Sequence, residues 1–127
     1  MKDFVIYHNP EVMGRSASEL VEFSVVTNKP VSNIEGDRVW LVTGEGRPRT
    51  FYLCAWFIAD RVERNTDPEF GTCVAGTHGK FFHPMIELNN EQWFGEFQRS
   101  QGNFAFGLQP ITDSRFIAGL ESAASKV

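Results

Sequence analysis

The sequence lacks several features that define common protein classes. It contains only two cysteines, Cys54 and Cys73, and no C-x-x-C pair, which excludes a disulfide framework and predicts free thiols. It has no apolar run long enough to cross a membrane as a helix. Its first residues lack the basic patch and apolar stretch of a secretion signal, so we expect a cytoplasmic protein.

Positive charge is also scarce. The 12 lysines and arginines are outnumbered by 16 acidic residues, which gives a formal net charge of −4. Proteins that coat nucleic acid concentrate lysine and arginine, so the net charge argues against general coating, whereas a small, local phosphate contact remains open. The length of 127 residues and the hydrophobic content of 42% predict a single domain, residues 1–127, with a core of its own.

Motifs of catalysis and metal binding are missing as well. There is no glycine-rich phosphate loop, no G-x-S-x-G and no H-E-x-x-H. His78 and His83 could meet around zinc with Cys73, but zinc sites normally have four ligands at tighter spacing. Cys54 lies in an apolar run, which is typical of a buried small hydrophobe. We therefore expect no metal and no cofactor.

Alternating apolar residues and turn signals predict an α+β fold. The expected strands are residues 4–7, 23–27, 38–43, 50–59, 81–88 and 104–109. The run 50–59 is apolar at successive positions, so it predicts a central strand that is covered on both faces. Asn90 and Asp113 are expected to cap two helices, the first ending at Gly102. Residues 64–79 show little periodicity and predict a long loop.

Three shorter patterns complete the expected order of elements. Ser16 followed by Glu19 is typical of a capping box and predicts a short helix. Residues 44–49 are rich in turn formers between two apolar runs, so they predict a hairpin loop. Pro84 predicts that its strand lies at a sheet edge or contains a bulge. Residues 122–127 are expected to form a frayed tail.

Small polar side chains stand beside aromatic rings along the first three expected strands. Aromatic residues make up 13% of the chain, with 12 phenylalanines and three tryptophans. The set consists of Tyr7, His8, Asn9, Phe23, Ser24, Asn28, Trp40 and Thr43. Rings supply stacking surface, and hydroxyl or amide groups read the hydrogen-bonding edge of a planar ligand. A base taken out of a nucleic-acid stack is such a ligand. The competing interpretation is that these rings belong to the core.

Short motifs in the first half of the chain resemble the PUA-like superfamily, specifically its EVE and YTH branches. Strand 4–7 followed by His8-Asn9 resembles a YTH strand that leads into a Ser-Asn pair. Phe23-Ser24 resembles the Trp-Ser-Thr start of the next strand, with Phe23 in place of the tryptophan. Residues 36–39, Gly-Asp-Arg-Val, resemble the turn into the third strand of EVE and ASCH domains. The resemblance covers residues 3–60 and implies a twisted, mostly antiparallel PUA-like β-barrel flanked by short helices.

The resemblance implies a nucleic-acid-binding module that recognises a modified base by flipping it into an aromatic pocket. Methylated or hydroxymethylated cytosine in DNA is the expected ligand. The stacking rings would be Phe23 and Trp40. The groups that read the base or border it would be Tyr7, His8, Asn9, Ser24, Asn28 and Thr43. The phosphates would meet Lys29, Arg47 and Arg49.

Similar stretches occur at the front of HNH-type restriction endonucleases, which implies a role in restriction and modification. His83-Pro84 and Asn89-Asn90 do not reproduce an HNH motif. Any nuclease activity would therefore lie in another domain or subunit.

Two other functions remain open at this point. Some ASCH-type relatives hydrolyse modified nucleosides with a lysine, a threonine and a carboxylate, and the corresponding residues would be Lys29, Thr27 and Glu87. Burial would be needed to keep that lysine deprotonated. The other alternative is a plain RNA-binding or interaction domain, which predicts no pocket deep enough for a base.

Overall fold

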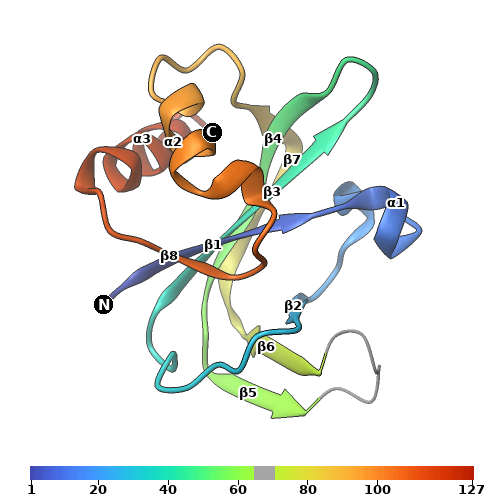
Figure 1. The fold of residues 1–127 in the computed structure, drawn as a ribbon, viewed down its shortest axis with the longest axis vertical. Coiled ribbons are helices and arrows are strands. Elements are labelled where there is room, and N and C mark those ends of the chain that lie inside the picture. Colours follow the sequence, from blue (N-terminus) through green and yellow to red (C-terminus); the bar gives the residue numbers. More distant parts are fainter. Residues whose placement is uncertain (65–70) are drawn as a thin grey trace.

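A computed structural model describes residues 1–64 and 71–127 (Figure 1). The strands are β1 (Asp3–His8), β2 (Phe23–Thr27), β3 (Arg38–Glu45), β4 (Thr50–Ile58), β5 (Arg61–Arg64), β6 (Thr72–Gly76), β7 (His78–Glu87) and β8 (Gln109–Ile111). They form a five-stranded sheet of order β7-β4-β3-β1-β8 and a three-stranded sheet of order β2-β6-β5. Their pairings are antiparallel except that of β1 with β3. The chain is thus α+β, as predicted.

The helices are short, and two of them cover one face of the large sheet. They are α1 (Pro10–Met13), α2 (Phe94–Ser100) and α3 (Ser114–Ser125), with 3-10 turns at Ala17–Glu19 and Gly102–Phe104. Figure 1 shows α2 and α3 side by side, away from the three-stranded sheet. Asp113 caps α3 as predicted, since its side chain accepts a hydrogen bond from the backbone N–H of Arg115. Ser16 and Glu19 form the predicted capping box, although it opens only a 3-10 turn.

The two sheets share one long bent hairpin. β4 passes through Ala59 and Asp60 into β5 of the small sheet, and β6 returns through Thr77 into β7 of the large one. At this corner the Asp60 carboxylate accepts hydrogen bonds from both the backbone N–H and the hydroxyl of Thr77, each 3.1 Å long. A Cβ at Gly76 would overlap the carbonyl oxygen of Ile58. Only glycine permits the two strands to approach this closely where they change sheets.

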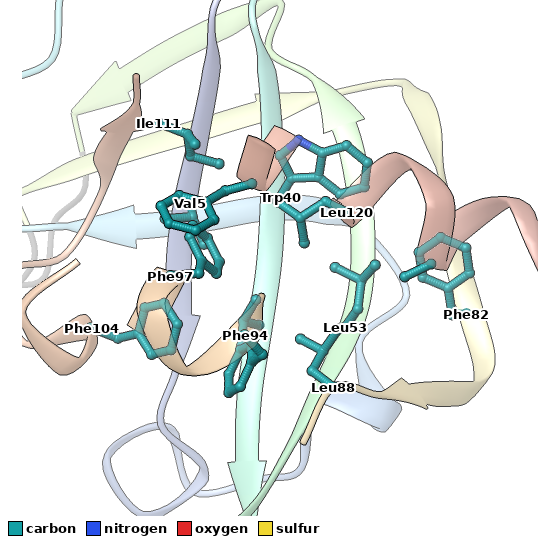
Figure 2. Packing of buried hydrophobic residues seen from close by; sticks show 13 residues of the cluster. Val5, Trp40, Leu53, Phe82, Leu88, Phe94, Phe97, Phe104, Ile111 and Leu120 are labelled. Atoms are coloured by element: carbon teal, nitrogen blue, oxygen red, sulfur yellow. The ribbon is translucent and has the colours of Figure 1, made fainter. Parts of the chain in front are cut away.

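The large sheet separates two cores. On one side α2 and α3 pack over Val5, Trp40 and Leu53, as Figure 2 shows for the labelled side chains. On the other side, Leu41 and Phe57 pack against the small sheet. β4 is central and buried from both sides, which confirms the prediction for residues 50–59. The side chains of β4 do not alternate strictly between the two faces, because the register with β7 shifts between Leu53 and Ala55 and moves the later residues to the opposite face.

Both sheets leave a strand edge open where β1 and β2 approach each other. β8 pairs with Asp3–Val5 alone, so within the described residues Ile6–His8 pair with β3 and with no other strand. β2 likewise pairs only with β6 in this part of the chain. No hydrogen-bonded ladder joins β1 to β2 among the described residues, so the strands form two sheets and no closed barrel.

Several predicted elements are wrong in place or kind. The expected loop 64–79 contains β6 and the start of β7, while residues 65–70 lie outside the described chain. The expected strand 104–109 is instead a 3-10 turn followed by an irregular segment, and β8 begins only at Gln109. These segments are fixed by pairing and packing with distant parts of the chain, which local periodicity does not record.

The helix ends also differ from the predictions. α2 begins at Phe94 without a side-chain cap, and the Asn90 side chain donates to Glu87 instead. α2 ends at Ser100, before Gly102. The expected frayed tail is helical as far as Ser125, because the apolar stripe of α3 continues through Ala123.

Candidate functional site

Two adjoining hollows lie between the open edges of β1 and β2. They enclose about 610 Å³ and about 430 Å³. Ile6, Tyr7, Met13 and Val26 border both of them, so they form one continuous depression, which we call the β1–β2 groove. Ligand-binding pockets usually have volumes of roughly 300–1,000 Å³. The groove therefore has the size of a site for a small planar ligand.

Exposed apolar side chains gather around this groove. Among the described residues, six large apolar side chains are exposed, and two of these, Met1 and Val127, are chain ends. The other four all line the groove; they are Val12, Met13, Val21 and Phe106. Val21 and Phe106 are 86% and 60% exposed. A cluster of exposed apolar surface in one depression indicates a binding site, because isolated side chains would be scattered over the surface.

His8 is buried at the wall of the first hollow and is held from two sides. Its Nε2 lies 2.9 Å from the carbonyl oxygen of Arg15. A carbonyl oxygen only accepts, so Nε2 carries a proton and donates. The Thr43 hydroxyl donates to the backbone carbonyl of His8 over 2.7 Å. Thr43 is fully buried and lines neither hollow, so its predicted role in base binding is wrong. Its side chain instead supports β1.

Four further predicted polar residues do meet in the groove. Ser24 lines the first hollow, and Asn9, Asn28 and Lys29 line the second. The Ser24 hydroxyl lies 3.2 Å from the thiol of Cys73. Asn9 caps α1 by accepting from the backbone N–H of Glu11. These side chains offer hydroxyl, amide and ammonium groups to a ligand with a polar edge.

The two predicted stacking rings do not reach the groove. Trp40 is 1% exposed, lies in the core beneath α3, and donates its Nε1–H to the Asp3 carboxylate over 2.8 Å. Phe23 stacks on Phe81, with 4.4 Å between ring centroids, and also on Phe57. Alternation along β3 directs Trp40 to the helix-covered face of the sheet, opposite to the groove. The predicted Phe23–Trp40 sandwich is therefore wrong.

Other rings border the groove instead. Tyr7 stacks in parallel on Phe104, at a centroid distance of 5.9 Å, and Phe106 follows in the same segment. Gly107 has a positive φ of 72°, and a Cβ there would lie only 3.0 Å from the Thr27 hydroxyl oxygen. Glycine thus lets this segment close the second hollow against β2. Sequence reasoning missed both phenylalanines because it placed them in a strand.

The β3–β4 hairpin touches the site through Tyr7. Arg49 donates to the Tyr7 hydroxyl over 3.2 Å, and this hydroxyl lies 3.5 Å from the carbonyl oxygen of Gly44. Burial raises the pKa of Tyr7, which outweighs the lowering effect of the Arg49 charge. Arg47 is exposed and pairs with Glu11 at 3.5 Å. Neither arginine lines a hollow, so only Lys29 of the three expected phosphate contacts lies in the groove itself.

Comparisons with protein-family models, with curated proteins and with solved structures found no match to this chain. Family membership is therefore not shown.

The structure separates the residues of the alternative enzyme site. Thr27 and Lys29 line the second hollow, whereas Glu87 ends β7 at the opposite edge of the large sheet. The lining of the second hollow contains no carboxylate among the described residues. The predicted hydrolase constellation is therefore not assembled.

The remaining chemistry-bearing residues are also apart. Within residues 1–64 and 71–127, no three histidine, cysteine or acidic side chains come together as metal ligands, so His78, His83 and Cys73 form no such cluster. Both cysteines are free, as predicted, and Cys54 is buried, which raises the pKa of its thiol. No helix in the described part of the chain has the length and apolar character of a membrane span.

Proposed function

We propose that the protein is a binding module that holds a nucleobase in the β1–β2 groove. The proposed ligand is a modified base in DNA, with methylated or hydroxymethylated cytosine as the first candidates. The observation that carries the proposal is the gathering of exposed apolar side chains and polar groups around a space of suitable size. A nuclease that acts with this module would lie in another domain or subunit.

The groove offers both kinds of contact that a base requires. The Phe106 ring and the Met13 side chain supply apolar surface for a flat face. Stacking of one base on an aromatic ring contributes about 1–3 kcal/mol. His8 and Ser24 in the first hollow and Asn28 in the second present hydrogen-bonding groups to the edge of the base. Contacts to the face and the edge of a base do not require many positive charges, so they suit an acidic chain that has little basic surface.

Charge contributes through a few positions only. Arg15 borders the first hollow and Lys29 the second, while Glu22 borders the first with the opposite sign. When the logarithm of the binding constant for duplex DNA is plotted against the logarithm of the salt concentration, each phosphate that a cation neutralises makes the slope steeper by about 0.9. The proposal therefore requires a shallow salt dependence, since most of the binding energy comes from the base.

Fluorescence anisotropy with labelled duplexes tests the proposal. The duplexes are identical except for one central cytosine, which is unmodified, 5-methylated or 5-hydroxymethylated. We expect tighter binding to a modified duplex, and we expect Phe106→Ala to weaken that binding by about 1–3 kcal/mol because its ring lines the groove. Equal affinity for all three duplexes, or no binding at all, would contradict the proposal.

A pair of charge variants shows where the DNA lies. Lys29→Ala removes a cation from the groove, and Arg61→Ala removes one from β5, two strands away from β2's open edge. Lys29→Ala is expected to weaken binding to every duplex and to reduce the logarithmic salt slope by about 1. Arg61→Ala is expected to change neither quantity. The reverse pattern would place the DNA on another surface.

The open strand edges favour one alternative, an interaction domain. Two facing edges with unpaired ladder positions can accept an extended peptide as an added strand. Such a peptide would bind through the backbone of Ile6–His8 or of β2, so its affinity would be insensitive to Phe106→Ala and to base modification. The duplex titration therefore separates the two functions.

A further inference from the structure

His8 has a fixed hydrogen-bonding pattern in the groove. Because Nε2 donates to the Arg15 carbonyl oxygen, the neutral ring has its lone pair on Nδ1. The His8 side chain is held in this orientation by its burial, with 7% exposure, and by the Thr43 bond to its backbone. The ring therefore offers a hydrogen-bond acceptor in one defined direction.

The acceptor nitrogen belongs to a residue that lines the first hollow. Within the described residues, no hydrogen bond reaches His8 Nδ1. In this part of the chain, Gln101 Oε1 is the only side-chain nitrogen or oxygen that is both fully buried and without a hydrogen-bond partner. Nδ1 has no partner either, so it is not fully buried and keeps contact with solvent. The open space that His8 borders is the first hollow. A ligand in that hollow thus meets Nδ1 as an unsatisfied acceptor.

We infer that His8 determines which class of base the groove accepts, an inference that rests on the proposed function. Nδ1 selects a base with an exocyclic amino group, as in cytosine or adenine, over one with a carbonyl oxygen at that position, as in thymine or uracil. An amino group donates to Nδ1, whereas a carbonyl oxygen would place two lone pairs against each other. A bound base takes water away from Nδ1, and an acceptor that loses water without gaining a donor is costly, so the mismatch lowers affinity.

The matched ligands are 5-methylcytosine and thymine. Both carry the same 5-methyl group, and they differ in the 4-amino or 4-oxo group and the adjacent ring nitrogen. Single-stranded oligonucleotides that contain one or the other at a single position remove the influence of base pairing. We expect the wild-type protein to bind the 5-methylcytosine strand roughly tenfold more tightly or better.

His8→Gln isolates the acceptor. The glutamine amide nitrogen can keep the donation to the Arg15 carbonyl. The amide oxygen is then the variant's one acceptor, on the carbon that bears that nitrogen, so the acceptor at the position of Nδ1 is lost. The variant is expected to bind the two strands with nearly equal affinity. The control is His83→Gln, the same substitution at an exposed histidine of β7, which is expected to keep the wild-type ratio.

A second measurement does not depend on a variant. Long-range proton–nitrogen NMR spectra of the wild-type protein should show that the neutral form of the His8 ring carries its proton on Nε2. The Nδ1 resonance should shift when the 5-methylcytosine strand is added. An Nδ1-protonated ring, or an unshifted Nδ1 in the complex, would overturn the inference.

The outcomes separate the inference from the proposed function. Equal wild-type affinity for both strands, or an unchanged ratio in folded His8→Gln, overturns the role of His8 and leaves nucleobase binding intact. Failure to bind either strand, or the modified duplexes, overturns the proposed function and this inference with it.

Discussion

At the scale of single residues, Tyr7 connects the groove to the rest of the fold. Its ring stacks on Phe104, and its hydroxyl contacts Arg49 and Gly44 of the β3–β4 hairpin. A Cβ at Gly44 would lie 2.6 Å from this hydroxyl oxygen, so any larger residue there would displace the Tyr7 hydroxyl. Any ligand in either hollow therefore lies beside a side chain that is already held by two other segments.

The ionisation of Tyr7 gives a first prediction. Burial raises its pKa, so in Tyr52→Phe, which leaves Tyr7 as the only tyrosine, the phenol should titrate above pH 10. As pH rises, the unfolded chain therefore loses this proton before the folded chain does. Tyr7 contributes fully to the free energy of unfolding below about pH 10, and this contribution is lost as pH rises through the pKa of the folded state. Ultraviolet absorbance of the phenolate measures the midpoint, and a value at or below 10 would contradict the burial of Tyr7.

Asp3 gives a second prediction, on stability. Its carboxylate is buried and accepts from Arg38 Nε over 2.6 Å and from Trp40 Nε1 over 2.8 Å. Asp3→Ala leaves a largely buried guanidinium and an indole N–H without this acceptor, and is expected to lower the free energy of unfolding by about 3–5 kcal/mol.

Glu121→Ala is the matched control, because it removes the other, exposed partner of Arg38. This substitution is expected to lower the free energy of unfolding by at most about 1 kcal/mol. Urea denaturation measures both changes. Similar losses in the two variants would show that the Asp3 contact is not the stronger one.

Single residues also show where sequence reasoning reached its limit. The polar residues His8, Asn9 and Ser24 were predicted at the site, and the fold brings them to the groove. Trp40 was predicted there too, but its burial depends on α3, which lies far along the chain and covers that face of β3. Phe106 carries no local signal, because its exposure becomes evident only when the whole surface is known.

At the scale of elements, the bent hairpin determines how the two sheets are placed. β4–β5 and β6–β7 change sheets together at Asp60 and Thr77. The apolar run of β4 was sufficient to predict its central place. β6 was missed because its five residues are short and lie next to turn formers, and its strand character comes from pairing with β2 and β5 on either side.

The corner of this hairpin gives a third prediction. Asp60→Ala removes the acceptor for both the N–H and the hydroxyl of Thr77 and is expected to lower the free energy of unfolding by about 1–2 kcal/mol. Thr77→Val removes only the hydroxyl bond, so its effect should be smaller. Chemical denaturation ranks the two variants, and an equal or larger loss in Thr77→Val would contradict the role given to the Asp60 carboxylate.

At the scale of the whole molecule, the proposed binding activity depends on one surface. The large sheet is covered by helices on one face and by the small sheet on the other, which leaves the junction of β1 and β2 as the place where strand edges, exposed apolar side chains and polar groups meet. The predicted α+β class follows from local patterns. The groove does not, because it is formed by two strands that fail to pair.

The most direct test is an NMR titration of the isotope-labelled protein with an oligonucleotide that contains 5-methylcytosine. We expect the largest amide shifts on residues of both groove walls, 6–9 on one side and 24–29 on the other, together with 104–107. Residues 61–64 of β5 and the exposed face of α3 should not shift. Saturable shifts confined to those outer surfaces, or no shifts at all, would contradict the central claim.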